Sequence, residues 1–177
     1  MIDYTKEELV ELINKHPEKF NQWKQEQDEV DLSETDFSSM SFNEVDFSNV
    51  DLNSSSFADC NLSLVNFNNT DLTSVDFTRA KVVECDFSES LLNGADCSYA
   101  EMTYCNFSDA DLAGCIFSEA NLSNSDFTAS YNLHACRFDD DTIWPDPEFM
   151  PDDFDAIYKD DLSAMKDDED DYSSSDY

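Results

Sequence analysis

The chain has 177 residues, of which 42 are acidic and 9 are basic, so its formal net charge is −33 at neutral pH. A charge of this size disfavours direct binding to nucleic acid or to an anionic membrane, and it favours a basic protein surface as partner. Hydrophobic residues make up 40% of the chain and include 14 Phe, which excludes a disordered acidic polymer and predicts a domain with a core.

Residues 1–29 predict a helical cap. Thr5 and Glu8 have the spacing of a capping box, and apolar residues follow them at helical spacing. Pro17 begins a second helical stretch that carries Phe20 and Trp23. No secretory segment or long apolar run is present in the sequence, so we expect a cytoplasmic protein.

From Val30 onward, a large apolar residue returns at every fifth position. This spacing fits neither the period of a helix nor that of a strand. In three of the four series formed by every fourth unit, one residue type recurs, so the underlying period is 20 residues; the remaining series is mixed: Phe42, Leu62, Val82, Met102 and Leu122. The clearest columns are Leu32, Leu52, Leu72, Leu92 and Leu112; Phe47, Phe67, Phe87, Phe107 and Phe127; and Phe37, Phe57, Phe77 and Phe117, interrupted by Cys97. Such self-similarity indicates a solenoid.

Four five-residue sides would form one coil, and each side would point two residues inward and three outward. The coils would stack at strand spacing, about 4.8 Å, so that identical side chains form ladders. The units VDFSN (45–49), ADLAG (110–114) and ANLSN (120–124) are similar to the A(D/N)LXX consensus of the pentapeptide repeat family. The resemblance implies an all-β fold, a right-handed quadrilateral β-helix (β-solenoid), over residues 30–138. Short helical segments are expected at both ends.

The five-residue phase shifts by one position after Ala129. We expect Ser130 to be the extra residue of a β-bulge. Leu133 then continues the Leu column and Phe138 continues the Phe37 column, which adds half a coil.

Residues 139–166 predict a C-terminal cap or dimerisation segment with an amphipathic helix after Pro151. Its apolar face includes Phe154, Ile157, Tyr158 and Leu162. This stripe either covers the last coil or forms a homodimer contact, which the resemblance to some family members implies. Residues 167–177 predict a disordered acidic tail.

The sequence offers no set of catalytic residues. Five of the six cysteines occupy the small inward position and Cys97 occupies a large one, so we expect buried hydrophobic side chains rather than nucleophiles or metal ligands. His16 and His134 lie at opposite ends of the predicted rod, and neither has the partners of a catalytic triad. We expect a protein that is not an enzyme and that binds no cofactor.

The residue before each large apolar centre is mostly Asp or Asn, and the Asp residues form three ladders. The ladders are Asp31, Asp51, Asp71 and Asp111; Asp46, Asp86 and Asp126; and Asp36, Asp76 and Asp96. They resemble the charge density of duplex DNA, about one negative charge per 1.7 Å of axis. Because Asp or Asn is the family consensus here, part of this charge comes with the fold. The family consensus does not account for the acids at other outward positions, which are Glu34, Glu44, Asp59, Glu84, Glu89, Asp109 and Glu119.

Outward positions turn apolar around the fourth coil, at Leu91, Tyr99, Tyr104 and Ile116. Aromatic residues in polar surroundings are typical of binding hot spots, although scattered apolar residues are common on protein surfaces. The sequence therefore leaves two functions open. In the first, the acidic ladders occupy the DNA groove of a basic DNA-binding protein, as the resemblance to acidic DNA-mimic members that bind DNA gyrase implies. In the second, the apolar residues bind a partner as a scaffold, without competing with DNA.

Overall fold

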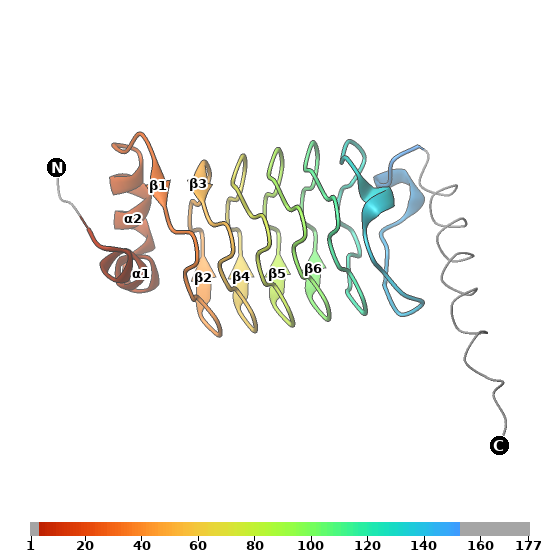
Figure 1. Ribbon diagram of the computed structural model, residues 1–177, viewed down its shortest axis with the longest axis horizontal. Coiled ribbons are helices and arrows are strands. Elements are labelled where there is room, and N and C mark those ends of the chain that lie inside the picture. Colours follow the sequence, from red (N-terminus) through yellow and green to blue (C-terminus); the bar gives the residue numbers. More distant parts are fainter. Residues whose placement is uncertain (1–3, 153–177) are drawn as a thin grey trace, which may run out of the picture.

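The computed structural model describes residues 4–152. Figure 1 shows a solenoid, in which two helices lie at the N-terminal end and a row of stacked coils follows. The β-solenoid expected from the repeats is therefore confirmed. Within residues 4–152, neither helix has the length and apolar character needed to cross a membrane.

Neighbouring coils pair in parallel with an offset of 20 residues. Strand β1 (Val30–Asp31) pairs with β3 (Val50–Asp51). Strands β2 (Ser41–Asn43), β4 (Asn61–Ser63), β5 (Lys81–Val83) and β6 (Glu101–Thr103) form a sheet in the order β2-β4-β5-β6. This register confirms the period read from the sequence.

Isolated bridges extend the pairing into four columns, which we name by their first residues. The Asp31 column continues through Asp51, Asp71, Leu91, Asp111 and Tyr131; the Asp36 column through Ser56, Asp76, Asp96, Ile116 and Arg137; the Ser41 column through Asn61, Lys81, Glu101, Asn121 and Ile143; and the Asp46 column through Asn66, Asp86, Asn106 and Asp126. Apart from Tyr131, which precedes Asn132, these residues stand next to apolar residues that pack into the core, so the columns lie on the outside of the coil.

Stacked phenylalanine rings fill much of the interior. In the column from Phe47 to Phe127, successive ring centroids lie 4.5–5.5 Å apart and the rings are nearly parallel. Phe37, Phe57 and Phe77 form a second stack with spacings of 4.8 and 5.3 Å. The two stacks meet edge to face at 5.7–6.0 Å, a geometry that aromatic rings favour.

All six cysteines are buried and unbridged, as expected for small hydrophobic side chains. Burial raises the pKa of the Cys60 thiol to about 11. Burial also raises the pKa of the Cys97 and Cys115 thiols. These three thiols are therefore protonated at neutral pH, and they act as core residues rather than nucleophiles.

From Leu32 to Leu122, each five-residue unit bends at the second residue after its apolar centre, where the backbone adopts a left-handed conformation. At the non-glycine examples from Glu34 to Asn124, φ lies between 52° and 62°. A backbone bond closes most of these bends, as from the Val50 N–H to the Phe47 carbonyl at 3.1 Å. We call this site of each unit the left-handed position. It favours Gly and Asn, because a Cβ atom is crowded there.

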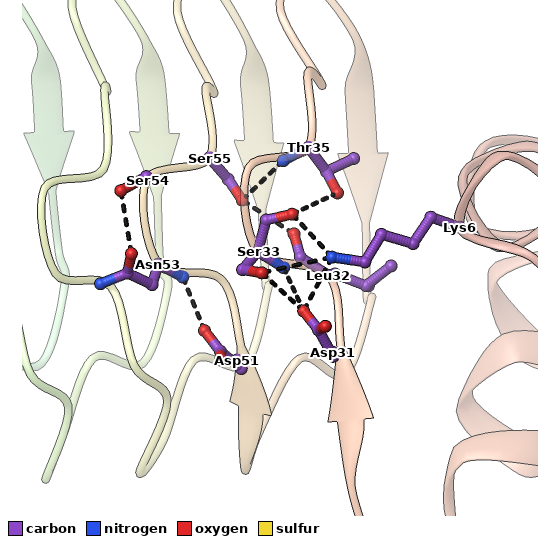
Figure 2. Close-up of polar contacts among 9 residues, drawn as sticks. All are labelled: Lys6, Asp31, Leu32, Ser33, Thr35, Asp51, Asn53, Ser54 and Ser55. Atoms are coloured by element: carbon purple, nitrogen blue, oxygen red, sulfur yellow. Dashed lines mark hydrogen bonds and ion pairs between the residues drawn. The ribbon is translucent and has the colours of Figure 1, made fainter.

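The Asp or Asn before each apolar centre closes its unit a second time, through its side chain. In all ten ladder aspartates, Oδ1 accepts a hydrogen bond from the N–H two residues later, at 2.8–3.2 Å. Figure 2 shows this bond from Ser33 to Asp31 and from Asn53 to Asp51. Asn66, Asn106 and Asn121 accept the same bond. This side-chain bond therefore requires an oxygen at the site and not a charge.

Two helices close the N-terminal end. The capping box of Thr5 and Glu8 forms as expected and begins α1 (Lys6–Lys15), and α2 (Pro17–Lys24) begins with Pro17. Phe20 of α2 is fully buried, with its ring centroid 5.8 Å from that of Phe47. This helix therefore covers the open end of the Phe47 stack.

Two lysines attach this cap to the first coil. Lys6 Nζ lies 2.8 Å from Asp31 Oδ1 and donates to the Ser33 carbonyl at 2.9 Å (Figure 2). Lys24 Nζ lies 2.9 Å from Asp46 Oδ1 and donates to the Ser48 carbonyl at 2.6 Å. The first Asp of two columns is therefore paired with a cation.

The phase shift near the C-terminal end lies at Asn132, so the assignment to Ser130 was wrong. Ser130 keeps the regular turn bond to the Phe127 carbonyl, and Tyr131 still bridges Asp111 at the 20-residue offset. Asn132 then adopts φ 59° and is followed by the short helix η1 (Leu133–Ala135). Asn tolerates this left-handed conformation well, which explains its place there.

Beyond this shift, Leu133 and Phe138 are buried as expected. Pairing continues past residue 138, because Ile143 bridges Asn121 and the Phe127 N–H donates to the Phe149 carbonyl at 2.8 Å.

Trp144 covers the last coil. Its ring lies edge-on to Phe117, Phe127 and Phe138, with centroids 5.4–6.1 Å away. The short helix η2 (Pro147–Phe149) follows it. The amphipathic helix expected up to residue 166, with Phe154, Ile157, Tyr158 and Leu162, and the expected tail at 167–177 lie outside the described residues.

Replacing Asp86 tests the role of the side-chain oxygen. Because Asn accepts the same bond elsewhere in this column, Asp86→Asn should leave the melting temperature within about 1 °C of the wild type, whereas Asp86→Ala should lower it by about 2–4 °C, corresponding to about 1 kcal/mol. Thermal unfolding followed by circular dichroism measures both variants. Equal losses in the two variants would show that the charge, and not the oxygen, stabilises the turn.

The lysine attachment predicts a specific acid sensitivity. Hydrogen bonds from Lys6 and Ser33 lower the pKa of Asp31 to about 2 from its usual 3.8. A lowered carboxyl pKa stabilises the fold above about pH 4, and this contribution is lost as the pH falls towards 2. Lys6→Gln should therefore lower the melting temperature at pH 6, and its difference from the wild type should shrink near pH 2. A difference that stays constant across this range would contradict the prediction.

Candidate protein-binding surface

The outward residues of the coil fall into two halves of different charge. The units that carry the Asp46 and Asp31 columns contain ten acidic residues and no Lys or Arg; we call them the acidic half. It comprises residues 30–34, 45–54, 65–74, 85–94, 105–114 and 125–134. The remaining units, from 35–44 to 135–138, form the mixed half, with eight acidic residues and the cations Arg79, Lys81 and Arg137. Because the coils stack in register, the units on one side of the rod carry only acidic charges of their own, and Lys6 and Lys24 of the N-terminal cap pair with the first two column aspartates there.

Two cations of the mixed half form ion pairs between neighbouring coils. Arg79 donates to both carboxylate oxygens of Asp59, at 2.8 and 2.9 Å, and its hydrogen bond lowers the pKa of that carboxyl. Lys81 lies 3.5 Å from Glu101. These pairs neutralise acids of the mixed half within the protein itself.

On the acidic half, amides separate some of the carboxylates. Asn66 Nδ2 donates to Asp46 Oδ1 at 3.2 Å, and Asn106 Nδ2 donates to Asp86 Oδ1 at 3.1 Å. The alternation of Asp and Asn in this column therefore reduces like-charge repulsion between coils and adds a hydrogen bond.

The structure distributes the ten predicted ladder aspartates over both halves. Asp31, Asp51, Asp71, Asp111, Asp46, Asp86 and Asp126 lie on the acidic half, and Asp36, Asp76 and Asp96 lie on the mixed half. Three of them are exposed, and the others are half-buried by neighbouring side chains. All ten accept the turn bond, so their presence is explained by the fold.

A second set of acids has no such explanation. Seven acidic residues occupy left-handed positions and are exposed, with φ between 54° and 59°: Glu34, Glu44, Asp59, Glu84, Glu89, Asp109 and Glu119. Five of them are Glu, which this conformation does not favour. These charges are therefore the stronger indication that the surface binds a partner.

The four predicted apolar residues lie in units of three different columns. Leu91 lies in the Asp31 column of the acidic half, and Ile116 is half-buried in the Asp36 column. Tyr99 and Tyr104 occupy left-handed positions of consecutive units in the mixed half, where they are 56% and 60% exposed.

Three further exposed apolar residues were missed by the sequence reasoning: Leu64, Tyr131 and Ile143. Leu64 occupies a left-handed position, and Tyr131 stands in the Asp31 column. The repeat phase predicts that both residues point outward. They were missed because neither belongs to a cluster of outward apolar residues in the sequence.

The described residues were also compared with the chemistry of a metal site. Within residues 4–152, no three His, Cys, Asp or Glu side chains come together as a metal site. What this arrangement supplies is an extended, one-sided anionic surface with isolated apolar side chains.

Comparisons with solved structures give the following matches. A pentapeptide repeat protein from the Arabidopsis thaliana thylakoid lumen is 29% identical, with a TM-score of 0.37; the alignment covers 57% of this chain and 63% of that protein. A pentapeptide repeat protein from Nostoc PCC 7120 is 25% identical, with a TM-score of 0.44, over 58% of this chain and 81% of that protein. QnrB1, a plasmid-mediated fluoroquinolone resistance protein, is 14% identical, with a TM-score of 0.44, over 75% of this chain and 83% of that one.

A search of curated protein sequences gave no significant match. Family models match most of the coil region. The model described as "Pentapeptide repeat region" matches residues 28–97, and the model described as "Pentapeptide repeats (8 copies)" matches residues 105–140. The chain belongs to the pentapeptide repeat family.

Proposed function

We propose that this protein is a non-catalytic, acidic DNA mimic that binds a DNA-binding enzyme in its DNA groove and thereby inhibits or protects that enzyme. The enzyme would be a gyrase-like topoisomerase, or a nuclease of host defence or repair. The proposal takes the fold to be a right-handed quadrilateral β-helix in the cytoplasm. The observation that carries it is the acidic half, which bears ten acidic residues and no Lys or Arg.

The physical argument rests on charge complementarity. A groove that binds DNA is lined by Lys and Arg, which neutralise phosphates spaced along the duplex. A rigid rod with carboxylates on one side offers such a groove a similar field, and it needs no ordering on binding. The exposed acids at left-handed positions support this function, because the turn itself does not select Glu.

A scaffold without DNA competition is the second candidate. Tyr99 and Tyr104 favour it, because both are more than half exposed in an unfavourable backbone conformation. A partner bound through these side chains would use the mixed half, and its affinity would respond weakly to salt.

Removal of two charges from each half tests the first candidate. Glu89→Gln with Asp109→Asn changes the acidic half, and Glu84→Gln with Glu119→Gln changes the mixed half by the same charge. Each pair includes one acid that accepts a tyrosine hydroxyl, Asp109 from Tyr131 and Glu119 from Tyr99. The first double variant should raise the concentration for half-inhibition at least about fivefold and the second less than about twofold.

The measurement is DNA supercoiling by gyrase, together with DNA cleavage by a panel of nucleases, at 50 and 200 mM salt. Inhibition by the wild type should weaken steeply with salt. If no enzyme of the panel responds at low salt and high protein concentration, the proposed function is wrong.

Replacing the exposed tyrosines separates the two candidates. Tyr99→Ser with Tyr104→Ser should change inhibition by less than about twofold, because both side chains lie on the mixed half. A loss of tenfold or more, combined with weak salt dependence, would favour the scaffold.

A further inference from the structure

We infer that Leu91 is an apolar anchor within the acidic half, and that the partner's basic groove contains an apolar recess that receives it. The inference rests on the proposed function and deepens it, because it concerns how the protein selects one basic groove among many.

Leu91 stands at a site where the fold favours Asp. It bridges Asp71 on one side and Asp111 on the other within the Asp31 column. In that column, Asp51 and Asp71 each accept a backbone N–H two residues later, at 2.9 Å. A leucine side chain has no atom that can accept this bond, so the substitution costs the turn a hydrogen bond.

The Leu91 side chain is also 46% exposed. It therefore gains only part of the stabilisation that full burial would give. An exposed apolar side chain that replaces a hydrogen-bonding one weakens the fold in two ways. Such a departure from the local rule is expected where a residue serves binding rather than folding.

Carboxylates and one aromatic ring lie on the same side of the rod as Leu91. Glu89 precedes it by two residues, and Asp109 occupies the same left-handed position one coil further on; both are exposed. Tyr131 lies two bridges along the Asp31 column, is 56% exposed, and donates its hydroxyl to Asp109 Oδ1 at 3.2 Å. An apolar centre within a charged rim is the arrangement found at interface hot spots.

The apolar side chain among these carboxylates is a feature that the phosphate backbone of DNA does not have. Carboxylates alone would fit any groove lined by Lys and Arg, so they supply attraction but little discrimination. Leu91 binds favourably only where the groove has a matching apolar recess. In a groove without one, the leucine side chain would remove water from polar groups of the partner without hydrogen-bonding to them, which weakens binding. The partner is therefore a basic groove with an apolar recess, not basic surfaces in general.

Replacing Leu91 by Asp tests the inference, because the anchor hypothesis and a purely electrostatic mimic predict opposite effects on binding. Leu91→Asp adds a negative charge and restores the turn acceptor, so a purely electrostatic mimic would bind equally well or more tightly. Under the anchor hypothesis, Leu91→Asp and Leu91→Asn should weaken inhibition at least about fivefold, while neither lowers the melting temperature. Leu91→Met keeps the apolar side chain and should stay within about twofold of the wild type.

Leu64 provides the matched control. It is also 46% exposed, and it lies in the mixed half. Leu64→Asp adds the same charge and should change inhibition by less than about twofold. The measurement uses the enzyme of the panel above, gyrase or nuclease, that the wild type inhibits most strongly.

The possible results are distinct. If the wild type inhibits an enzyme and Leu91→Asp inhibits it equally or better, the anchor is overturned while the DNA mimic stands. Equal losses for Leu91→Met and Leu91→Asn would also overturn the anchor, because apolar character would then not matter. If the wild type inhibits no enzyme of the panel, the proposed function fails and the anchor fails with it.

Discussion

The constant register between coils is the constraint on which the rest of the structure depends. An offset of 20 residues places each side chain over its counterpart in the next coil, both in the phenylalanine stacks and in the outer columns. Parallel pairing satisfies the backbone groups, and edge-to-face contacts lock the two stacks together. A local choice at one sequence position therefore becomes a column on the surface, and segregated charges in the sequence become a charged side of the rod.

The side-chain bond within each unit leaves the surface charge free to vary. Asp and Asn both supply the oxygen that accepts the N–H two residues later, as Asp86 and Asn106 do in one column. The fold thus tolerates a nearly neutral or a strongly acidic version of the same coil. The acids at left-handed positions, such as Glu89, go further, since they occupy sites where Asn or Gly would suit the backbone better.

Much of this fold could be predicted from the sequence, because the 20-residue repeat exposes the register directly. The N-terminal capping box and the buried cysteines were also predictable, since each follows from local chemistry. The position of the extra residue was not, because Ser130 and Asn132 are both small and polar and only the bridge from Tyr131 to Asp111 decides between them. The apolar residues were grouped by nearness in the chain, whereas the coil separates Leu91 from Tyr104 onto different columns.

The division of charge between the two halves has a consequence for how the rod moves in an electric field. The units of the acidic half carry ten acids and no Lys or Arg, whereas those of the mixed half carry eight acids and three cations. Negative charge is therefore displaced across the rod towards the acidic half, which creates a dipole perpendicular to the axis. Near a cationic surface, this dipole applies a torque that turns the acidic half towards that surface before contact and reduces the orientational search that precedes productive binding.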